Sequence, residues 1–316
     1  MRVAILGLGS IGGIFLSSLA DSSADIIVVC RGIKSQLISN DGIILYAPEG
    51  TIDTIPADMF TLIDSELGPI PNTMRKSCDV AIICGKTNST PILAEMAYEL
   101  LSDAGIVMSI QNGLGHSEYL CKKFGQRRVL GSTVTHGAWH SQNSFHWEGR
   151  GVVKMGNLEG GAPSKQESEL FKLLDNSNLS PIWSEDINKE IWIKLLINIA
   201  INPLCAITGL KNGAIKSIPL MWDQAVASMS EASQIAIASG INISDVNFEN
   251  LLDEIVTSTA NNRCSMLQDI MANKPTEIET LCGEIVKRGE SFGIPTPLNS
   301  MLLTLIEGIE NSSNFE

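Results

Sequence analysis

The stretch RVAILGLGSIGG, residues 2–13, decides the fold, because a short apolar run leads directly into closely spaced glycines. Val3–Leu6 has the composition of a strand, and an apolar helix containing Ile14 and Phe15 follows the glycines. In such a unit one glycine permits a tight turn, one admits a pyrophosphate to the backbone N–H groups, and one lets the helix pack closely. A glycine-rich turn without a ligand is the alternative, but the strand and helix on either side favour dinucleotide binding at the helix N-terminus. The predicted contacts are Gly7, Leu8, Gly9, Ser10, Ile11 and Gly12.

The second predicted strand, Ile26–Cys30, is followed by Arg31. NAD sites usually place an acid at the end of this strand for the ribose 2′-hydroxyl, whereas NADP sites place an arginine nearby for the 2′-phosphate. An acid is missing here and a guanidinium is present, so the sequence favours NADPH, with Arg31 on its 2′-phosphate. The alternative is that Arg31 is an ordinary solvated surface residue.

The rest of the first half alternates strand and helix patterns, with further strands expected at Val80–Cys84 and Ile106–Ile110. This alternation predicts an α/β domain with a doubly wound, Rossmann-type parallel sheet. Residues 129–155 are broken by glycines and are expected to form antiparallel strands that close the sheet, with another short strand near Pro181–Trp183. Lys86 and Asn112 follow two of the central strands, at the edge where such sheets bind ligands.

After Ser184 the apolar residues recur at helical spacing to the end of the chain. We therefore expect two domains, a dinucleotide-binding domain at residues 1–184 and an all-α domain at residues 185–316. The expected helices span Ile187–Asn202, Leu220–Ser239, Phe248–Thr259, Ile278–Phe292 and Leu298–Ile309, and Gly240 and Gly293 have the positions of C-terminal caps.

A stripe of polar residues marks the first of these helices, because Lys194, Asn198 and Asn202 recur every four residues in an otherwise apolar segment. A helix that is apolar all round should be buried, and burying an ammonium and two amides without partners is costly. A site for a polar ligand would offset this cost; a solvent-facing stripe is the alternative. Farther along, Ser265 begins a helix and Glu277 is expected in the first turn of the next, where an acid also simply stabilises the helix dipole.

The composition of the chain disfavours several classes of function and partner. The chain has 316 residues, 44% of them hydrophobic, and a formal net charge of −13, which disfavours a nucleic-acid partner. Its seven cysteines are scattered without a C-x-x-C pair and are typical of reduced thiols in the cytoplasm. The N-terminus lacks the pattern of a signal peptide, and the apolar stretch Ile191–Leu204 is too short for a membrane span, so we expect no membrane partner. His136, His140 and His146 lack a neighbouring acid cluster, so we predict no metal.

Taken together, these segments resemble the ketopantoate reductases (2-dehydropantoate 2-reductases) from Met1 to about Pro297. The shared motifs, in chain order, are GLGSIG at 7–12, Arg31, Lys86, QNG at 111–113, W-x-K-L-x-x-N-x-x-x-N-P-L at 192–204, SMLQDI at 265–270 and TEIE at 276–279. Two positions depart from the pattern, and both bear on substrate fit: Glu279, where the family more often has Asp, and Cys264, where a small or hydroxyl residue is expected.

The resemblance implies a reductase that transfers hydride from NADPH to the C2 ketone of a small-molecule 2-oxo acid bound between the two domains. Lys194 would be the general acid, since an ammonium can stabilise and protonate the developing oxyanion, and a lysine with an unperturbed pKa of about 10.4 is charged at neutral pH. Glu277 would support Lys194 or hold a substrate hydroxyl. Lys86 and Asn112 would contact the nucleotide and the nicotinamide ribose. The implied substrate contacts are Asn112, Lys194, Asn198, Asn202, Ser265 and Glu277.

Three functions remain open on the sequence. The first is an NADPH-dependent 2-dehydropantoate 2-reductase of pantothenate and coenzyme A biosynthesis. The second is a reductase of the same fold that acts on another 2-oxo or 2-hydroxy acid, because few pocket residues decide that choice. The third is a non-catalytic NADPH-binding sensor, against which the intact Lys194, Asn198 and Glu277 argue. A homodimer is left open as an assembly.

Overall fold

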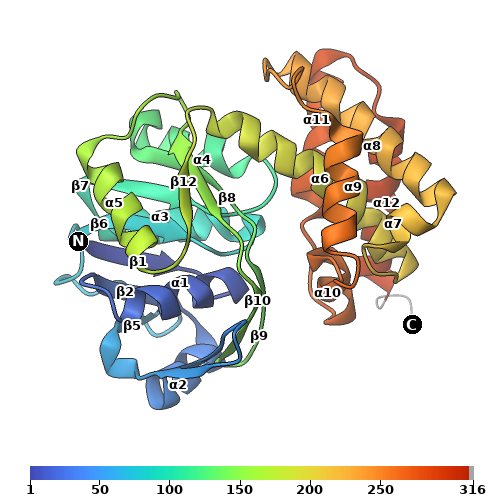
Figure 1. The fold of residues 1–316 in the computed structure, drawn as a ribbon. Helices are drawn as coiled ribbons and strands as arrows, with labels where there is room; N and C mark the ends of the chain where they lie inside the picture. Colours follow the sequence, from blue (N-terminus) through green and yellow to red (C-terminus); the bar gives the residue numbers. More distant parts are fainter. Residues whose placement is uncertain (313–316) are drawn as a thin grey trace. The chain divides into compact units, whose positions relative to one another are not determined.

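A computed structural model describes residues 1–312, which divide into two compact units (Figure 1). The first unit comprises Met1–Gln111 and His116–Ile187, and the second comprises Asn112–Gly115 and, of the described residues, 188–312. The short segment Asn112–Gly115 follows a strand of the first unit in sequence but makes its contacts with the helices of the second. A single polar residue of this segment, Asn112, therefore belongs to the helical unit.

The first unit is built on an eight-stranded sheet with the strand order β12-β11-β8-β7-β6-β1-β2-β5. All of its pairings are parallel except that of β8 with β11. This confirms the predicted α/β class with a mostly parallel, doubly wound sheet. The strands are β1 (Arg2–Leu6), β2 (Asp25–Cys30), β5 (Thr61–Asp64), β6 (Cys78–Ile83), β7 (Leu101–Ser109), β8 (Val129–Val134), β11 (Val153–Asn157) and β12 (Pro181–Trp183).

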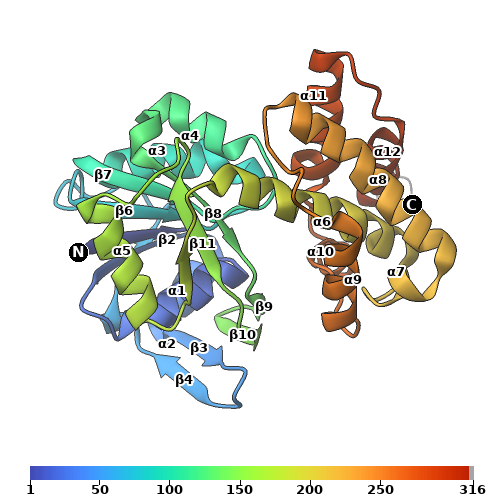
Figure 2. The same ribbon diagram turned by 45° about the horizontal axis from the view of Figure 1, so that its top comes forward.

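Both faces of this sheet are covered by helices, which is why its strands read as continuous apolar runs. On β1, Val3 and Ile5 face one hydrophobic cluster and Ala4 and Leu6 face the other. The first cluster includes residues of α1 (Ser10–Ala20) and α5 (Lys165–Asn176), and the second includes residues of α3 (Thr90–Leu100) and α4 (His116–Phe124). Figure 2 shows these helices on either side of the strands. Helix α2 (Gly32–Asp41) follows β2.

Residues 129–155 contain the expected antiparallel pair in the main sheet, β8 with β11, but the two strands between them belong to a second, four-stranded sheet. Its order is β4-β3-β10-β9, formed by β3 (Ile43–Tyr46), β4 (Ile52–Ile55), β9 (Gly137–Ser141) and β10 (Ser144–Gly149). Phe145 of β10 packs so closely on α1 that a Cβ on Gly13 would lie 1.9 Å from its ring. The glycine pattern predicted antiparallel strands here, but the partner strands of β9 and β10 and their packing on α1 are tertiary contacts that the pattern does not contain.

The second unit is helical throughout, as expected. Its helices are α6 (Ile187–Thr208), α7 (Ala214–Ser217), α8 (Pro219–Ala238), α9 (Phe248–Ser258), α10 (Ser265–Met271), α11 (Glu284–Phe292) and α12 (Pro297–Asn311). A π-helical turn, η4 (Glu279–Gly283), precedes α11, so the single helix expected from Ile278 begins with a wider turn. Gly240 and Gly293 have positive φ angles of 84° and 68° at the ends of α8 and α11, as C-terminal caps do.

Helix α6 is the one helix among residues 1–312 that is long and apolar enough to cross a membrane. Its apolar side chains are nevertheless enclosed by protein, since Leu196, Ile199 and Cys205 have no exposed surface and Leu195 has 1%. An apolar helix buried on most sides is the core helix of its unit. The polar residues of α6 therefore require a structural or chemical explanation.

Candidate functional site

The glycine loop lies between β1 and α1, and two of its glycines are required by the backbone. Gly7 has a φ angle of +91°, and a Cβ there would lie 2.6 Å from the backbone nitrogen of Gly85. A Cβ on Gly12 would lie 2.4 Å from the carbonyl oxygen of Gly7. Any side chain at either position would therefore displace backbone atoms, so these glycines bring the loop, α1 and the end of β6 into close contact.

Gly9 is different, because no atom among the described residues lies close enough to require a glycine there. The nearest atom to a Cβ on Gly9 would be the Cys84 carbonyl oxygen, 3.9 Å away. Gly9 is the N-cap residue of α1, no side chain caps this helix end, and its first turn contains no acid. Open space beside uncapped backbone N–H groups fits an anionic group such as a pyrophosphate.

Two side chains from distant elements hold the loop. The ammonium of Lys34 on α2 donates to the Leu8 carbonyl at 2.9 Å, and the Ser10 hydroxyl lies 3.0 Å from Nδ1 of His140 on β9. Leu8 is buried, and Ile11 is partly buried against the core. In the sequence, His140 stood out only as a possible metal ligand, and Lys34 did not stand out at all. No local pattern identifies either residue, because both reach the loop through tertiary packing.

Arg31 is exposed and occupies the N-cap of α2. The sequence shows no acid at the end of β2, but the neighbouring strand β5 brings two. Asp64 Oδ1 accepts the backbone N–H of Gly32 at 3.4 Å, and a carboxylate oxygen of Glu66 lies 3.1 Å from the Cβ position of Gly32. The end of β2 therefore combines a guanidinium with two carboxylates, which come from another part of the chain and do not show in the sequence of β2 itself.

The ends of the central strands β6 and β7 also meet as expected. Gln111, just after β7, donates from its amide nitrogen to the Gly85 carbonyl at 2.7 Å, and its amide oxygen accepts from Thr90 at 3.0 Å. Lys86 follows Gly85 and is partly buried. This buried amide ties the loop after β6 to the loop after β7, and it keeps Lys86 at the carboxyl edge of the sheet.

In the helical unit, the polar stripe of α6 is joined to residues far away in sequence. The Lys194 ammonium donates to Oδ1 of Asn112 at 2.8 Å, and the Asn112 amide donates to Oε2 of Glu277 at 2.9 Å. The segment that carries Asn112 is held in place by a backbone hydrogen bond of 3.0 Å from Leu114 to Thr280. An ammonium and a carboxylate are therefore connected through one amide. The amide oxygen accepts from the ammonium, and the amide nitrogen donates to the carboxylate.

Glu277 lies just before the helical turn rather than inside it, which corrects the expected position. Its backbone carbonyl accepts the N–H groups of Thr280 and Leu281, both at 3.1 Å. The carbonyl of Glu277 therefore starts the turn, while its carboxylate is directed to Asn112. The acid consequently has a partner in the site, beyond the helix-stabilising role that its sequence position alone suggested.

The pKa of Lys194 is lower than the unperturbed value expected from the sequence. Desolvation by burial lowers it to about 8, and the negative charge of Glu277 partly opposes this shift. Such a lysine is still mainly protonated at neutral pH but releases its proton far more readily than an exposed one. A pKa close to the operating pH suits a group that donates a proton in a reaction.

A small cavity adjoins this network, and it collects the remaining predicted substrate contacts. It is lined by Asn112, Asn198, Asn202, Ser265, Met266, Asp269, Glu277 and Leu281. Asn202 is buried, Asn198 is partly buried and Ser265 is exposed. Asp269 was not predicted, although its position four residues after Ser265 on α10 places both on one helix face.

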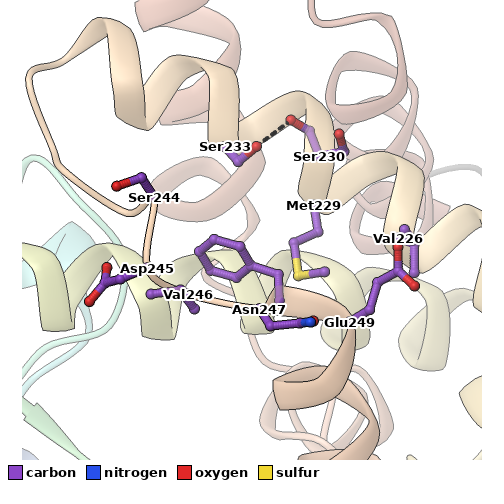
Figure 3. Close-up of a pocket in the computed structure, with 10 residues that line it drawn as sticks. Val226, Met229, Ser230, Ser233, Ser244, Asp245, Val246, Asn247 and Glu249 are labelled. Atoms are coloured by element: carbon purple, nitrogen blue, oxygen red, sulfur yellow. Dashed lines mark hydrogen bonds between the residues drawn. The ribbon is translucent and has the colours of Figure 1, made fainter.

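A second, larger hollow of about 510 Å³ lies elsewhere in the helical unit, beside α8 and the segment before α9 (Figure 3). Met229 and Ser233 of α8 face Asp245 and Asn247 across it. Asp245 is engaged by the ammonium of Lys189 at 2.6 Å. None of the predicted site residues lines this hollow, so size alone does not mark the candidate site.

Comparison with protein families and with curated relatives gives a consistent result over the whole chain. Residues 3–160 match the family model "Ketopantoate reductase PanE/ApbA", and residues 186–310 match "Ketopantoate reductase PanE/ApbA C terminal". A 2-dehydropantoate 2-reductase of Archaeoglobus fulgidus is 31% identical over 98% of both chains. The enzyme of the same name from Pyrococcus horikoshii is 30% identical over the same shares.

Solved structures share the fold. A PanE/ApbA family ketopantoate reductase from Ralstonia eutropha JMP134 superposes with a TM-score of 0.87 at 24% identity, covering 99% of this chain and 100% of that one. A D-mandelate dehydrogenase, solved with NADH and anilino(oxo)acetate, superposes with a TM-score of 0.88 at 20% identity and the same coverage. The fold is thus shared by proteins whose names give different substrates.

Proposed function

Because the chain belongs to the ketopantoate reductase family, whose members are NAD(P)-dependent oxidoreductases, we propose that it reduces 2-dehydropantoate to pantoate with NADPH. The observation that carries the proposal is the Lys194–Asn112–Glu277 network beside a polar cavity. A partly buried ammonium, held by an amide and next to polar groups, suits the reduction of a ketone. The product would enter pantothenate and coenzyme A biosynthesis in the cytoplasm.

The acid step is assigned to Lys194. A bound nicotinamide supplies the hydride, and the protein supplies binding, orientation and the proton. Negative charge builds on the ketone oxygen during reduction, and the Lys194 ammonium can stabilise it and donate its proton there. Asn112 orients the ammonium through its Oδ1, and Glu277 fixes the direction of the Asn112 amide. The carboxylate of Glu277 also raises the pKa of Lys194 and so keeps more of it protonated.

The residues that line the small cavity would bind the substrate. A 2-oxo acid offers a carboxylate and a ketone, and 2-dehydropantoate adds a hydroxyl. The amides of Asn198 and Asn202 and the hydroxyl of Ser265 can donate to these oxygens. Asp269 is a further candidate, as an acceptor for the substrate hydroxyl. A carboxylate there would disfavour a second anionic group and so select for a hydroxyl at that end.

The cofactor is assigned to the loop after β1. The space beside Gly9 and the uncapped end of α1 would accept the pyrophosphate, and Arg31 would accept the 2′-phosphate. Lys86, at the end of β6, would contact the nucleotide. The carboxylates of Asp64 and Glu66 oppose a phosphate near Gly32, so the preference for NADPH over NADH depends on Arg31 outweighing them.

A second candidate function is the reduction of a different 2-oxo acid by the same chemistry. The D-mandelate dehydrogenase has the same fold, and its name shows that this fold serves other 2-hydroxy acids. Met266, Asp269 and Leu281 would decide between substrates, because they are the lining residues left to contact the part of the substrate beyond the keto acid. A non-catalytic NADPH sensor is disfavoured, since a sensor has no use for an ammonium with a lowered pKa.

The deciding experiment measures the loss of nicotinamide absorbance with NADPH or NADH and a panel of 2-oxo acids. We expect the highest kcat/KM with 2-dehydropantoate and NADPH. A higher value for another acid would replace the substrate assignment but keep the chemistry. If the protein binds NADPH tightly but turns over none of these acids, both reductase hypotheses are refuted, and a non-catalytic NADPH sensor becomes the remaining hypothesis.

A further inference from the structure

Two cysteines meet behind the candidate substrate cavity. Cys205 lies on α6 and Cys264 is the N-cap residue of α10. The Cys264 thiol donates to the carbonyl oxygen of Asn202 on α6, less than one helical turn before Cys205, and each of the two thiols shifts the pKa of the other. Both are free; Cys205 has no exposed surface and Cys264 has 7%. Two thiols brought together from helices far apart in sequence form a potential disulfide, whereas each alone would be an inert core residue.

The pair is linked directly to the cavity walls. Cys264 Sγ accepts the backbone N–H of Leu267 at 3.4 Å and donates to the carbonyl oxygen of Asn202 at 3.6 Å. Asn202 precedes Cys205 by less than one helical turn, and Ser265 follows Cys264 directly. Asn202 and Ser265 both line the cavity. A movement of the two sulfur atoms would therefore move two of its walls.

We propose that Cys205 and Cys264 are an oxidation site, at which a small peroxide converts the two thiols into an intramolecular disulfide that alters the adjacent cavity. The oxidant is hydrogen peroxide or a compound of similar size, because the slight exposure of Cys264 does not admit a bulky disulfide. The surrounding cytoplasm keeps thiols reduced, so the disulfide would be a transient, regulatory form.

The reaction has two balanced steps. The Cys264 thiolate attacks one peroxide oxygen, the O–O bond breaks, and the hydroxide that leaves takes up the proton of the thiol to become water. The product is a sulfenic acid. The Cys205 sulfur then attacks this sulfur, and the displaced oxygen leaves as a second water with the Cys205 proton. Two thiols are oxidised by two electrons in total, and one peroxide is reduced to two waters.

The environment of the sulfur atoms sets the order of the steps. The hydrogen bond from Cys205 lowers the pKa of Cys264, and the N–H of Leu267 acts in the same direction against the effect of burial. The same hydrogen bond and burial raise the pKa of Cys205. Cys264 is therefore the nucleophile and the more exposed of the two, and Cys205 is the resolving thiol.

The effect on the cavity follows from bond lengths. A disulfide brings the sulfur atoms to about 2.05 Å, far closer than two hydrogen-bonded thiols. Cys264 Sγ then has no proton to donate to the carbonyl of Asn202, and its movement toward Cys205 weakens the hydrogen bond from the N–H of Leu267 at the start of α10. We expect Ser265 and Asn202 to shift and the KM for the 2-oxo acid to rise several-fold. This expectation on KM rests on the proposed function, whereas the disulfide itself does not.

The test begins with the chemistry and needs no activity. The purified full-length protein is treated with hydrogen peroxide, alkylated under denaturing conditions and digested without reductant. Mass spectrometry should find the peptides that contain Cys205 and Cys264 joined by a disulfide. When the protein is first reduced with dithiothreitol and then alkylated, both cysteines should instead carry the alkyl group. The link should be absent in Cys205→Ala and in Cys264→Ser, whose hydroxyl can still cap α10. It should persist in Cys282→Ala, which removes another fully buried cysteine of the same unit. Both thiols remaining free after treatment would overturn the proposal.

The second readout is the steady-state kinetics of the oxidised protein. The rise in KM for the keto acid should be reversed by dithiothreitol, be absent in Cys205→Ala and be retained in Cys282→Ala. The dissociation constant of NADPH, measured by fluorescence, should not change, because the glycine loop belongs to the other unit. A disulfide that forms without any change in KM would refute its link to the cavity. If no keto acid is turned over, the proposed function fails, and the peptide map still decides the oxidation site.

Discussion

The glycine loop and the Lys194 network illustrate two ways in which a chain builds a binding site. The loop uses consecutive residues, and its geometry follows from local backbone constraints at Gly7 and Gly12. The network uses Asn112, Lys194 and Glu277, which are far apart in sequence and belong to three different segments. The first is readable from a motif, whereas the second exists only after the helical unit has folded.

The two regions also differ in what surrounds their charges. The loop presents backbone N–H groups to open space, so its attraction for an anion is a property of a helix end. The network encloses a cation, and desolvation changes its acidity. The loop therefore suits binding, and the network suits proton transfer. The following variants separate these two roles.

The largest expected effect is that of Lys194→Ala. Removal of the proposed general acid should lower kcat by a factor of about 100 or more, while the dissociation constant of NADPH changes little. The matched control is Lys189→Ala, which removes a lysine of the same helix that pairs with Asp245 outside the cavity. If Lys194→Ala keeps nearly full turnover, Lys194 is not the group that donates the proton.

Gly9→Ala tests the loop without disturbing the fold. The new methyl group meets no protein atom within 3.9 Å, so the melting temperature should be unchanged. The same methyl group would occupy the space assigned to the pyrophosphate, and NADPH should bind about tenfold more weakly, which is about 1.4 kcal/mol. Gly308→Ala, at an open position on α12, is the control. Unchanged NADPH binding would show that the pyrophosphate lies elsewhere.

Arg31→Ala addresses the choice of cofactor. Loss of the guanidinium should weaken NADPH binding about tenfold, or about 1.4 kcal/mol, and leave NADH binding nearly unchanged. Glu66→Gln should act in the opposite direction and strengthen NADPH binding, because it removes a carboxylate beside Gly32. Fluorescence titration with both cofactors measures the effects, with Arg127→Ala as an exposed control. Equal losses for NADPH and NADH would contradict a 2′-phosphate contact.

The smallest effect is expected from pH. Lys194 must be protonated to act as an acid, so kcat for reduction should fall as the pH rises through about 8. The stability effect has the opposite sign. The native pKa of Lys194 lies below its unfolded value of about 10.4, so the unfolded state binds more protons between these values. The contribution of Lys194 to stability therefore rises with pH across this window.

These two pH effects are separable by measurement. The kinetic profile is recorded with saturating substrate, and the stability profile is recorded by denaturant unfolding at each pH. In Lys194→Met the increase in stability between about pH 8 and pH 10.4 should be smaller than in the parent protein. A kcat that stays constant from pH 7 to pH 9 would argue against proton donation by Lys194 in the rate-limiting step.

The sequence by itself determined the glycine loop, the class of the main sheet, the helical second half and the polar stripe of α6. These depend on periods and local constraints, such as the helical spacing that links Lys194 to Asn202. Only the tertiary structure decided which residues complete them. It placed Asn112 with the helical unit, paired β9 and β10 with β3 and β4, and brought Asp64 and Glu66 to the start of α2.

The physical reason is the range of the interactions. A strand, a helix or a tight turn is specified within a few residues, whereas the acidity of Lys194 and the contact of Cys205 with Cys264 depend on what packs against them from elsewhere in the chain. Desolvation and hydrogen bonding between distant segments leave no periodic trace in the sequence. For that reason the motif could propose Lys194 as a candidate acid, whereas only the folded protein lowers its pKa to about 8.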